Sequence, residues 1–123
     1  MSHRPVPEDV RDLILRHIHS VAQLEALMFL RARPAESWDA PSIAKRLYAP
    51  ETEMVHALAR LCSDGFLRRE GPAYRYESSE ESSGTVDRLA AAYARHLIPI
   101  TQLIHTMSPN ITAFSEAFKF RKD

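Results

Sequence analysis

Residues 51–70, ETEMVHALARLCSDGFLRRE, constrain the fold more than any other stretch, because a helical pattern stops at a glycine and an apolar, basic segment follows. The apolar residues recur at the spacing of one helix face: Met54, Val55, Leu58, Leu61 and Cys62. Gly65 supplies the left-handed residue that commonly ends a helix. The pattern predicts a helix that begins near residue 51, packs one face against a core and ends at Gly65.

The segments on either side of this helix are short. Residues 41–48, PSIAKRLY, have the apolar spacing of a short helix, which Ala49-Pro50 ends. Residues 66–70 and 73–77 flank a Gly71-Pro72 turn and predict a small β-hairpin. Trp38, in the loop before the short helix, is expected to cap the core with its N–H turned to a partner or to water.

The two ends of the chain are predicted to be helical. Residues 7–34 begin with a proline and two acids that suit a first turn, and Ser20 is a candidate cap for a second helix. The pattern leaves open whether this segment is one bent helix or a pair. Residues 78–84 are polar and predict a loop, and residues 85–123 have helical spacing again. Pro99 predicts a kink near Arg95 or a break into two helices.

The chain is predicted to be one domain, residues 1–123, because this length supports a single core. Its fold class is mainly α with a small β-hairpin. Apolar residues make up 45% and charged residues 26%, a globular composition. No run has the length of a membrane span, the N-terminus lacks a secretion signal, and there is one cysteine, so we expect a cytoplasmic protein.

The central segment SIAKRLYAPETEMVHALARLCSDGFLRREGPAYRYES resembles the winged helix-turn-helix of MarR-type and PadR-type bacterial transcriptional regulators. The likeness rests on the order short helix, break, longer helix, glycine and hairpin, and it covers roughly a third of the chain. It implies a winged helix-turn-helix core at residues 41–77 with additional N- and C-terminal helices. It also implies a non-catalytic DNA-binding regulator that binds double-stranded DNA.

The resemblance further implies which residues contact DNA. Residues 51–64 would lie in the major groove, with exposed side chains that can bond base edges, and the hairpin and the short helix would supply phosphate contacts. The predicted DNA-binding residues are Lys45, Arg46, Thr52, His56, Arg60, Arg68, Arg69 and Arg75.

Charge argues for an alternative. Sixteen basic residues balance sixteen acidic ones, and residues 41–77 hold six basic and five acidic groups, so long-range attraction to DNA is weak. Glu51 and Glu53 occupy the end of the helix that approaches DNA in most such complexes, although first-turn acids also stabilise a helix by about 0.3–1 kcal/mol. The alternative is a winged-helix adaptor that binds a partner protein and no DNA.

The residues offer little that indicates catalysis or metal binding. None of the six histidines forms an i, i+4 pair, and His17 and His19 would lie about 200° apart on a helix. No phosphate-binding glycine loop or hydrolase motif is present. We therefore expect no enzyme activity, no metal and no cofactor.

The C-terminal segment carries an apolar seam at helical spacing, which has two interpretations: Val86, Leu89, Tyr93, Leu97, Ile100 and Ile104. It can complete the core of the monomer, or it can pair with a second copy, as the resemblance implies because such regulators dimerise through terminal helices. The phenylalanines near the C-terminus are expected to dock on the helices of the chain itself or of its dimer mate, with a different protein partner as the alternative. The predicted dimer-interface residues are Leu89, Tyr93, Leu97, Ile100, Ile104, Phe114 and Phe118.

Overall fold

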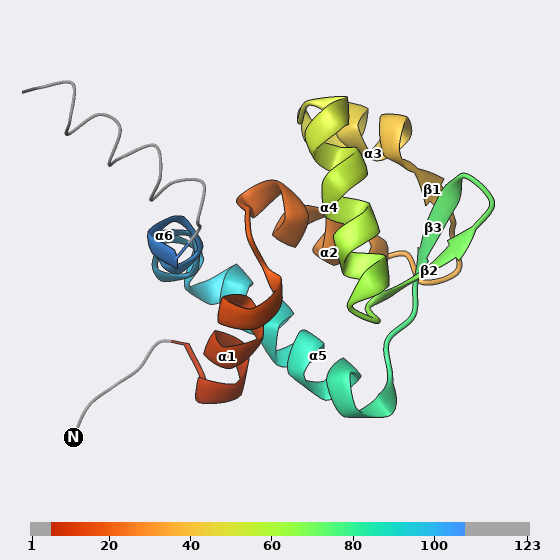
Figure 1. Ribbon diagram of the computed structural model, residues 1–123. Coiled ribbons are helices and arrows are strands. Elements are labelled where there is room, and N and C mark those ends of the chain that lie inside the picture. The colour runs from red at the N-terminus through yellow and green to blue at the C-terminus, as the bar shows by residue number, and fades with distance from the viewer. Residues whose placement is uncertain (1–5, 108–123) are drawn as a thin grey trace, which may run out of the picture.

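The computed structural model describes residues 6–107, which form six helices and three short strands (Figure 1). In chain order the elements are α1 (Glu8–His17), α2 (Val21–Arg31), β1 (Trp38–Asp39), α3 (Ala40–Leu47), α4 (Glu51–Ser63), β2 (Leu67–Glu70), β3 (Ala73–Tyr76), α5 (Glu80–Arg95) and α6 (Leu97–Met107). The mainly helical class with a small hairpin is confirmed. The predicted interface residues Phe114 and Phe118 lie outside the described residues.

The N-terminal segment is a pair of helices, α1 and α2, with a bend of 115° between them. The Ser20 hydroxyl accepts a hydrogen bond from the Gln23 N–H (3.0 Å), as a helix cap does. Gln23 is only 2% exposed, and its side chain donates to the His17 carbonyl (2.8 Å) and accepts from the His19 N–H (2.7 Å). These bonds fix the corner between the two helices.

Helices α3 and α4 follow with their own end signals. The Asp39 carboxylate accepts from the Ser42 N–H (2.9 Å) and caps α3, and Gly65 adopts a φ of 91° after α4, as predicted. The core-facing side of α4 consists of Met54, Ala57, Leu58 and Leu61. Val55, which the sequence pattern assigned to this stripe, is 45% exposed because it lies at the stripe's edge.

The three strands form an antiparallel sheet in the order β1-β3-β2. The predicted hairpin is confirmed, with Arg68 opposite Arg75 and Arg69 opposite Tyr74. The sequence placed Trp38 in a loop, whereas it forms the two-residue strand β1 against β3. Two residues carry no detectable periodicity, so only the partner strand defines this element.

The predicted loop at residues 78–84 is wrong beyond its second residue. Helix α5 begins at Glu80, because the Ser79 hydroxyl accepts from the Ser82 N–H (3.2 Å) and two glutamates fill the first turn. The break that Pro99 predicted is confirmed, since α5 ends at Arg95 and α6 begins at Leu97.

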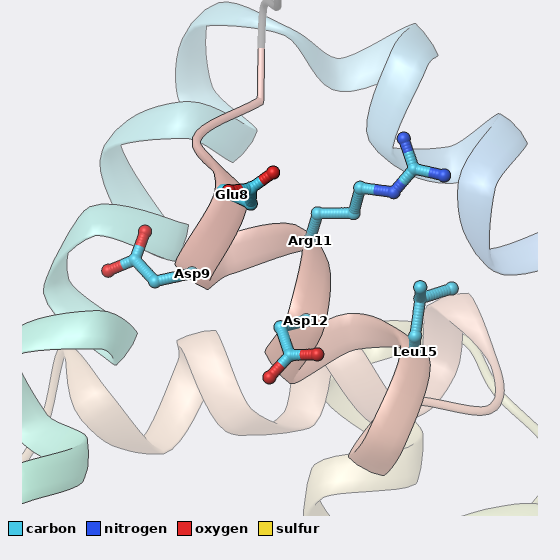
Figure 2. Close-up of a pocket in the computed structure, with 5 residues that line it drawn as sticks. All are labelled: Glu8, Asp9, Arg11, Asp12 and Leu15. Atoms are coloured by element: carbon cyan, nitrogen blue, oxygen red, sulfur yellow. The ribbon is translucent and has the colours of Figure 1, made fainter.

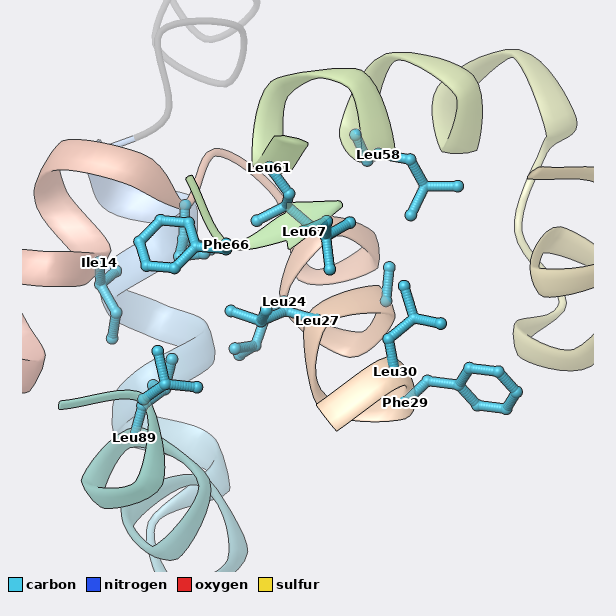
Figure 3. Packing of buried hydrophobic residues seen from close by; sticks show 14 of the residues in the cluster. Ile14, Leu24, Leu27, Phe29, Leu30, Leu58, Leu61, Phe66, Leu67 and Leu89 are labelled. Carbon is cyan, nitrogen blue, oxygen red and sulfur yellow. The ribbon is translucent and has the colours of Figure 1, made fainter. Parts of the chain in front are cut away.

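One hydrophobic core joins these elements, with Leu24 and Leu27 of α2 in its middle (Figure 3). Leu89, Ile100 and Ile104 lie in this core at 0%, 0% and 1% exposure. They were predicted to contact a second copy, and this assignment is wrong because the monomer itself buries them.

Tyr93 and Leu97 complete the described part of the predicted interface. The Tyr93 hydroxyl donates to Glu25 of α2 (3.2 Å), and burial, reinforced by that carboxylate, raises the pKa of Tyr93 to about 12. The Tyr93 side chain therefore also packs within the monomer. Leu97 is 51% exposed and is the one described seam residue still available to a partner.

Within residues 6–107, no single helix is long and apolar enough to cross a membrane. Helices α1 and α2 meet that criterion only as the bent pair, and both bury apolar side chains in the protein core.

Candidate nucleic-acid interface

The exposed face of α4 is neutral and made of short or medium side chains along its centre. The residues opposite the buried stripe are Thr52, His56, Ala59 and Ser63, and all are exposed. Thr52 and Ser63 each carry a hydroxyl, and His56 carries two ring nitrogens, so this strip offers hydrogen-bonding groups without a fixed charge. Such a surface allows close approach of another macromolecule.

Charged side chains lie at the margins of this strip. Glu51 and Glu53 are exposed in the first turn of α4, and neither forms an ion pair within residues 6–107. Arg60, 52% exposed, stands one turn before the other end, where its Nε lies 3.6 Å from Asp64 Oδ2. The helix therefore presents negative charge at its start and positive charge near its end.

An open groove of about 900 Å³ separates the start of α2 from this face of α4. Its lining residues are His19, Ser20, Gln23, Glu53, His56, Ala57, Ala59 and Arg60. The His19 Nε2 atom is buried and has no hydrogen-bond partner within the described residues. Burial, followed by the positive charge of Arg60, lowers the pKa of His19, so the ring favours its neutral form.

The two basic side chains of α3 differ in the contacts that they make. Lys45 is exposed and has no ion pair within the described part of the chain. Arg46 lies over two aromatic rings, 5.5 Å from the centre of Phe29 and 5.4 Å from that of Trp38. The rings meet edge to face at 4.8 Å, and the Trp38 N–H donates to Glu36 (2.8 Å), so Trp38 caps the core as predicted.

The arginines of the hairpin are held by neighbouring acids and carbonyls. Arg68 lies 3.5 Å from Glu77 and 4.0 Å from Glu70. Arg75 also pairs with Glu70 (3.5 Å) and donates to the Pro34 carbonyl (3.0 Å). A hydrogen bond from Ser37, and then the charges of Arg75 and Arg68, lower the pKa of Glu70, so this carboxylate stays ionised.

Arg69 is the hairpin arginine without an acidic partner among the described residues. Its Nε donates to the Gly71 carbonyl (3.0 Å), and its guanidinium lies 5.9 Å from the Tyr74 ring centre. The sequence suggested that alternate hairpin arginines face outward, yet Arg68 and Arg69 are both exposed. Long side chains at a sheet edge reach solvent from either face.

The structure thus brings Thr52, His56 and Arg60 together on one face of α4, as predicted. Sequence reasoning missed His19 and Gln23, which complete the groove, because their positions follow from the corner between α1 and α2. It also missed Tyr48, which precedes α4 by three residues and is 96% exposed. The Ala49-Pro50 break after it was the available signal.

A second hollow, of about 480 Å³, lies along α1 (Figure 2). All of its lining residues come from that single helix: Glu8, Asp9, Arg11, Asp12 and Leu15. Asp9 pairs with Arg88 of α5, and Asp12 pairs with Arg16. Among residues 6–107, no group of three or more His, Cys, Asp or Glu side chains could hold a metal ion.

Comparison of the chain with models of known protein families, with curated proteins and with solved structures gave no match.

Proposed function

We propose that residues 21–76 form a winged helix-turn-helix and that the chain is a non-catalytic transcriptional regulator of the cytoplasm that binds double-stranded DNA. The element order α2-β1-α3-α4-β2-β3 and the sheet order β1-β3-β2 support this class. In it, α4 is the helix that reads DNA and the hairpin is the wing. The likeness to MarR-type and PadR-type bacterial regulators belongs to the same proposal.

The observation that carries the proposal is the exposed strip of α4. A helix that enters the major groove must bring its side chains to the base edges, and the exposed strip of Thr52, His56, Ala59 and Ser63 has side chains short enough to allow that approach. The guanidinium of Arg60 at its margin can bond guanine in competition with Asp64, and Glu53 can accept from the amino group of cytosine.

The hairpin charges determine what kind of DNA binding we propose. Glu70 and Glu77 already pair with Arg68 and Arg75, so phosphates must compete with these carboxylates. Non-specific affinity is therefore low, and base contacts from α4 supply most of the discrimination between sites. Lys45 and Arg69, which have no acidic partner in residues 6–107, are the proposed phosphate contacts.

We propose a homodimer, because two-fold symmetry matches paired DNA half-sites. The buried seam residues are not available for it. Leu97 and Ile98 are 51% and 64% exposed at the start of α6, and they are the apolar pair that we place at the interface.

A protein-binding adaptor is the second candidate. The placement of the acidic residues favours it. Glu51 and Glu53 are exposed at the start of α4, and Glu70 and Glu77 interrupt the positive charge of the hairpin. A protein partner would face the same strip of α4. Recovery of a partner protein, together with no DNA binding, would select this candidate.

The test is selection from a random-sequence DNA pool on the full chain, followed by binding curves across salt concentrations. We expect Arg60→Ala to weaken binding to the selected site by about 1–3 kcal/mol, and Arg69→Ala to weaken all sequences similarly and flatten the salt dependence. Arg16→Ala, on an exposed arginine of α1, is the matched control. No DNA binding at low salt by the intact protein refutes the proposal.

A further inference from the structure

Tyr48 has a backbone conformation that its residue type disfavours. Its φ of 56° makes it the one non-glycine residue of positive φ among residues 6–107. The N–H groups of Tyr48 and Ala49 both donate to the Ala44 carbonyl, a helix ending that glycine normally occupies. For a bulky side chain this conformation is strained, and such strain persists where the surrounding structure or a function requires it.

Packing does not explain the residue. The Tyr48 side chain is 96% exposed and makes no hydrogen bond or ring contact within the described part of the chain. The other described tyrosines behave differently, since Tyr74 is 8% exposed and Tyr76 and Tyr93 bond Ser78 and Glu25. The Tyr48 backbone is strained and its ring is unpacked, so the ring adds little to the fold and is free to contact a partner outside the monomer.

The position of Tyr48 indicates which contact. It ends α3 three residues before α4 begins at Glu51, at the end of α4 that enters the groove in the proposed complex. Lys45, exposed one helical turn earlier, is a proposed phosphate contact. A tyrosine at this place can pack its ring on a sugar and donate one hydrogen bond to a phosphate oxygen without carrying a charge.

We propose that Tyr48 contacts the sugar–phosphate backbone of DNA beside the start of α4, with its ring against a deoxyribose and its hydroxyl donating to a phosphate oxygen. The inference rests on the proposed DNA-binding function. Tyr48 lies outside α4, and its contact would contribute DNA affinity that does not depend on salt concentration.

The experiment compares Tyr48→Gly, Tyr48→Asn and Tyr48→Phe with Lys45→Ala, on a duplex that the wild-type chain selects from a random-sequence pool. Gly and Asn tolerate the left-handed conformation, so both raise the melting temperature, and both weaken DNA binding by roughly tenfold. The salt slope stays unchanged because no charge is lost, whereas Lys45→Ala lowers it by about 1. Tyr48→Phe keeps the ring and loses part of the affinity.

Opposite signs for stability and binding are the distinguishing result, since a merely structural tyrosine would change both in the same direction. DNA affinity within about twofold of wild type for Tyr48→Gly and Tyr48→Asn overturns the inference while the DNA-binding function stands. A lower melting temperature for both variants also overturns it. No DNA binding by the wild-type chain refutes the function itself, and the inference with it.

Discussion

The Nδ1 atom of His17 lies 3.0 Å from Oδ2 of Asp64, which joins the last residue of α1 to the residue that follows α4. Arg60 approaches the same carboxylate oxygen at 3.6 Å, and the His17 ring meets Phe66 edge to face at 5.2 Å. Because α1 packs against α5 and α6, this joint connects the terminal helices to α4. The orientation of the proposed DNA-reading helix is thus tied to the terminal helices.

We expect Asp64→Ala to lower the free energy of unfolding by about 1–2 kcal/mol, because the half-buried His17 and the exposed Arg60 lose their shared, largely buried acceptor. Asp12→Ala is the matched control, since it removes an exposed pair with Arg16 and should cost about 0–1 kcal/mol. Urea denaturation measures both. Equal losses would show that the joint contributes no more than a surface ion pair.

The His19 ring predicts a pH dependence of stability. Its pKa in the folded chain lies below the ordinary value of 6.5, first because of burial and then because of Arg60, so the unfolded chain binds the proton more tightly. The contribution of His19 to stability is therefore full above pH 6.5 and falls as the pH falls through 6.5 toward the lower folded pKa. Thermal melts from about pH 8 to about pH 5 measure it.

His19→Leu is the variant for this prediction. It removes the titrating ring, and it leaves no new unpaired group because Nε2 has no partner within residues 6–107 and the backbone N–H keeps its bond to Gln23. Its stability should fall less than that of wild type over the acid range. His56→Gln, on an exposed ring, is the matched control. An unchanged slope in His19→Leu would assign the pH dependence to other groups.

The sequence predicted those parts of the fold that local chemistry determines. Ser20 and Gly65 end or begin helices through bonds within a few residues, so they could be recognised from the sequence. Pro99 gave the break between α5 and α6 for the same reason. The exposed face of α4 followed from its apolar spacing, which places Thr52 and His56 opposite the core.

The remainder depends on contacts between distant segments. Helical spacing marked Leu89 and Ile104 as a buried seam, but it could not say whether the same chain or a second one buries them. The pairing of Arg75 with Glu70 follows from the strand register and from the reach of the side chains, and neither can be read from the composition of the chain. Polar composition misjudged residues 80–84, because a serine cap and first-turn glutamates start a helix without any apolar residue.

The ion pairs of the hairpin arginines predict that the hairpin glutamates limit DNA affinity. The double substitution Glu70→Gln with Glu77→Gln leaves Arg68 and Arg75 without their carboxylate partners. We expect roughly tenfold tighter binding to any DNA sequence at low salt and a steeper salt dependence, because more phosphates are neutralised. Fluorescence anisotropy with unrelated duplexes measures both quantities.

Glu80→Gln with Glu81→Gln is the control for this effect, because it changes the net charge equally at the start of α5. It should alter DNA affinity far less than the hairpin pair. If both double variants tighten binding to the same extent, net charge alone is responsible and the hairpin does not contact DNA.

The exposed pair at the start of α6 predicts the oligomeric state. Leu97 and Ile98 are 51% and 64% exposed, and burying such side chains against a second copy contributes about 25 cal/mol per Å² of apolar surface. We expect the 14.0 kDa chain to be a dimer, and Leu97→Gln with Ile98→Gln to be a folded monomer, by light scattering coupled to size-exclusion chromatography. Val55→Gln, another exposed apolar position, should stay dimeric. A monomeric wild type, or a double variant that remains dimeric, would remove these residues from the interface.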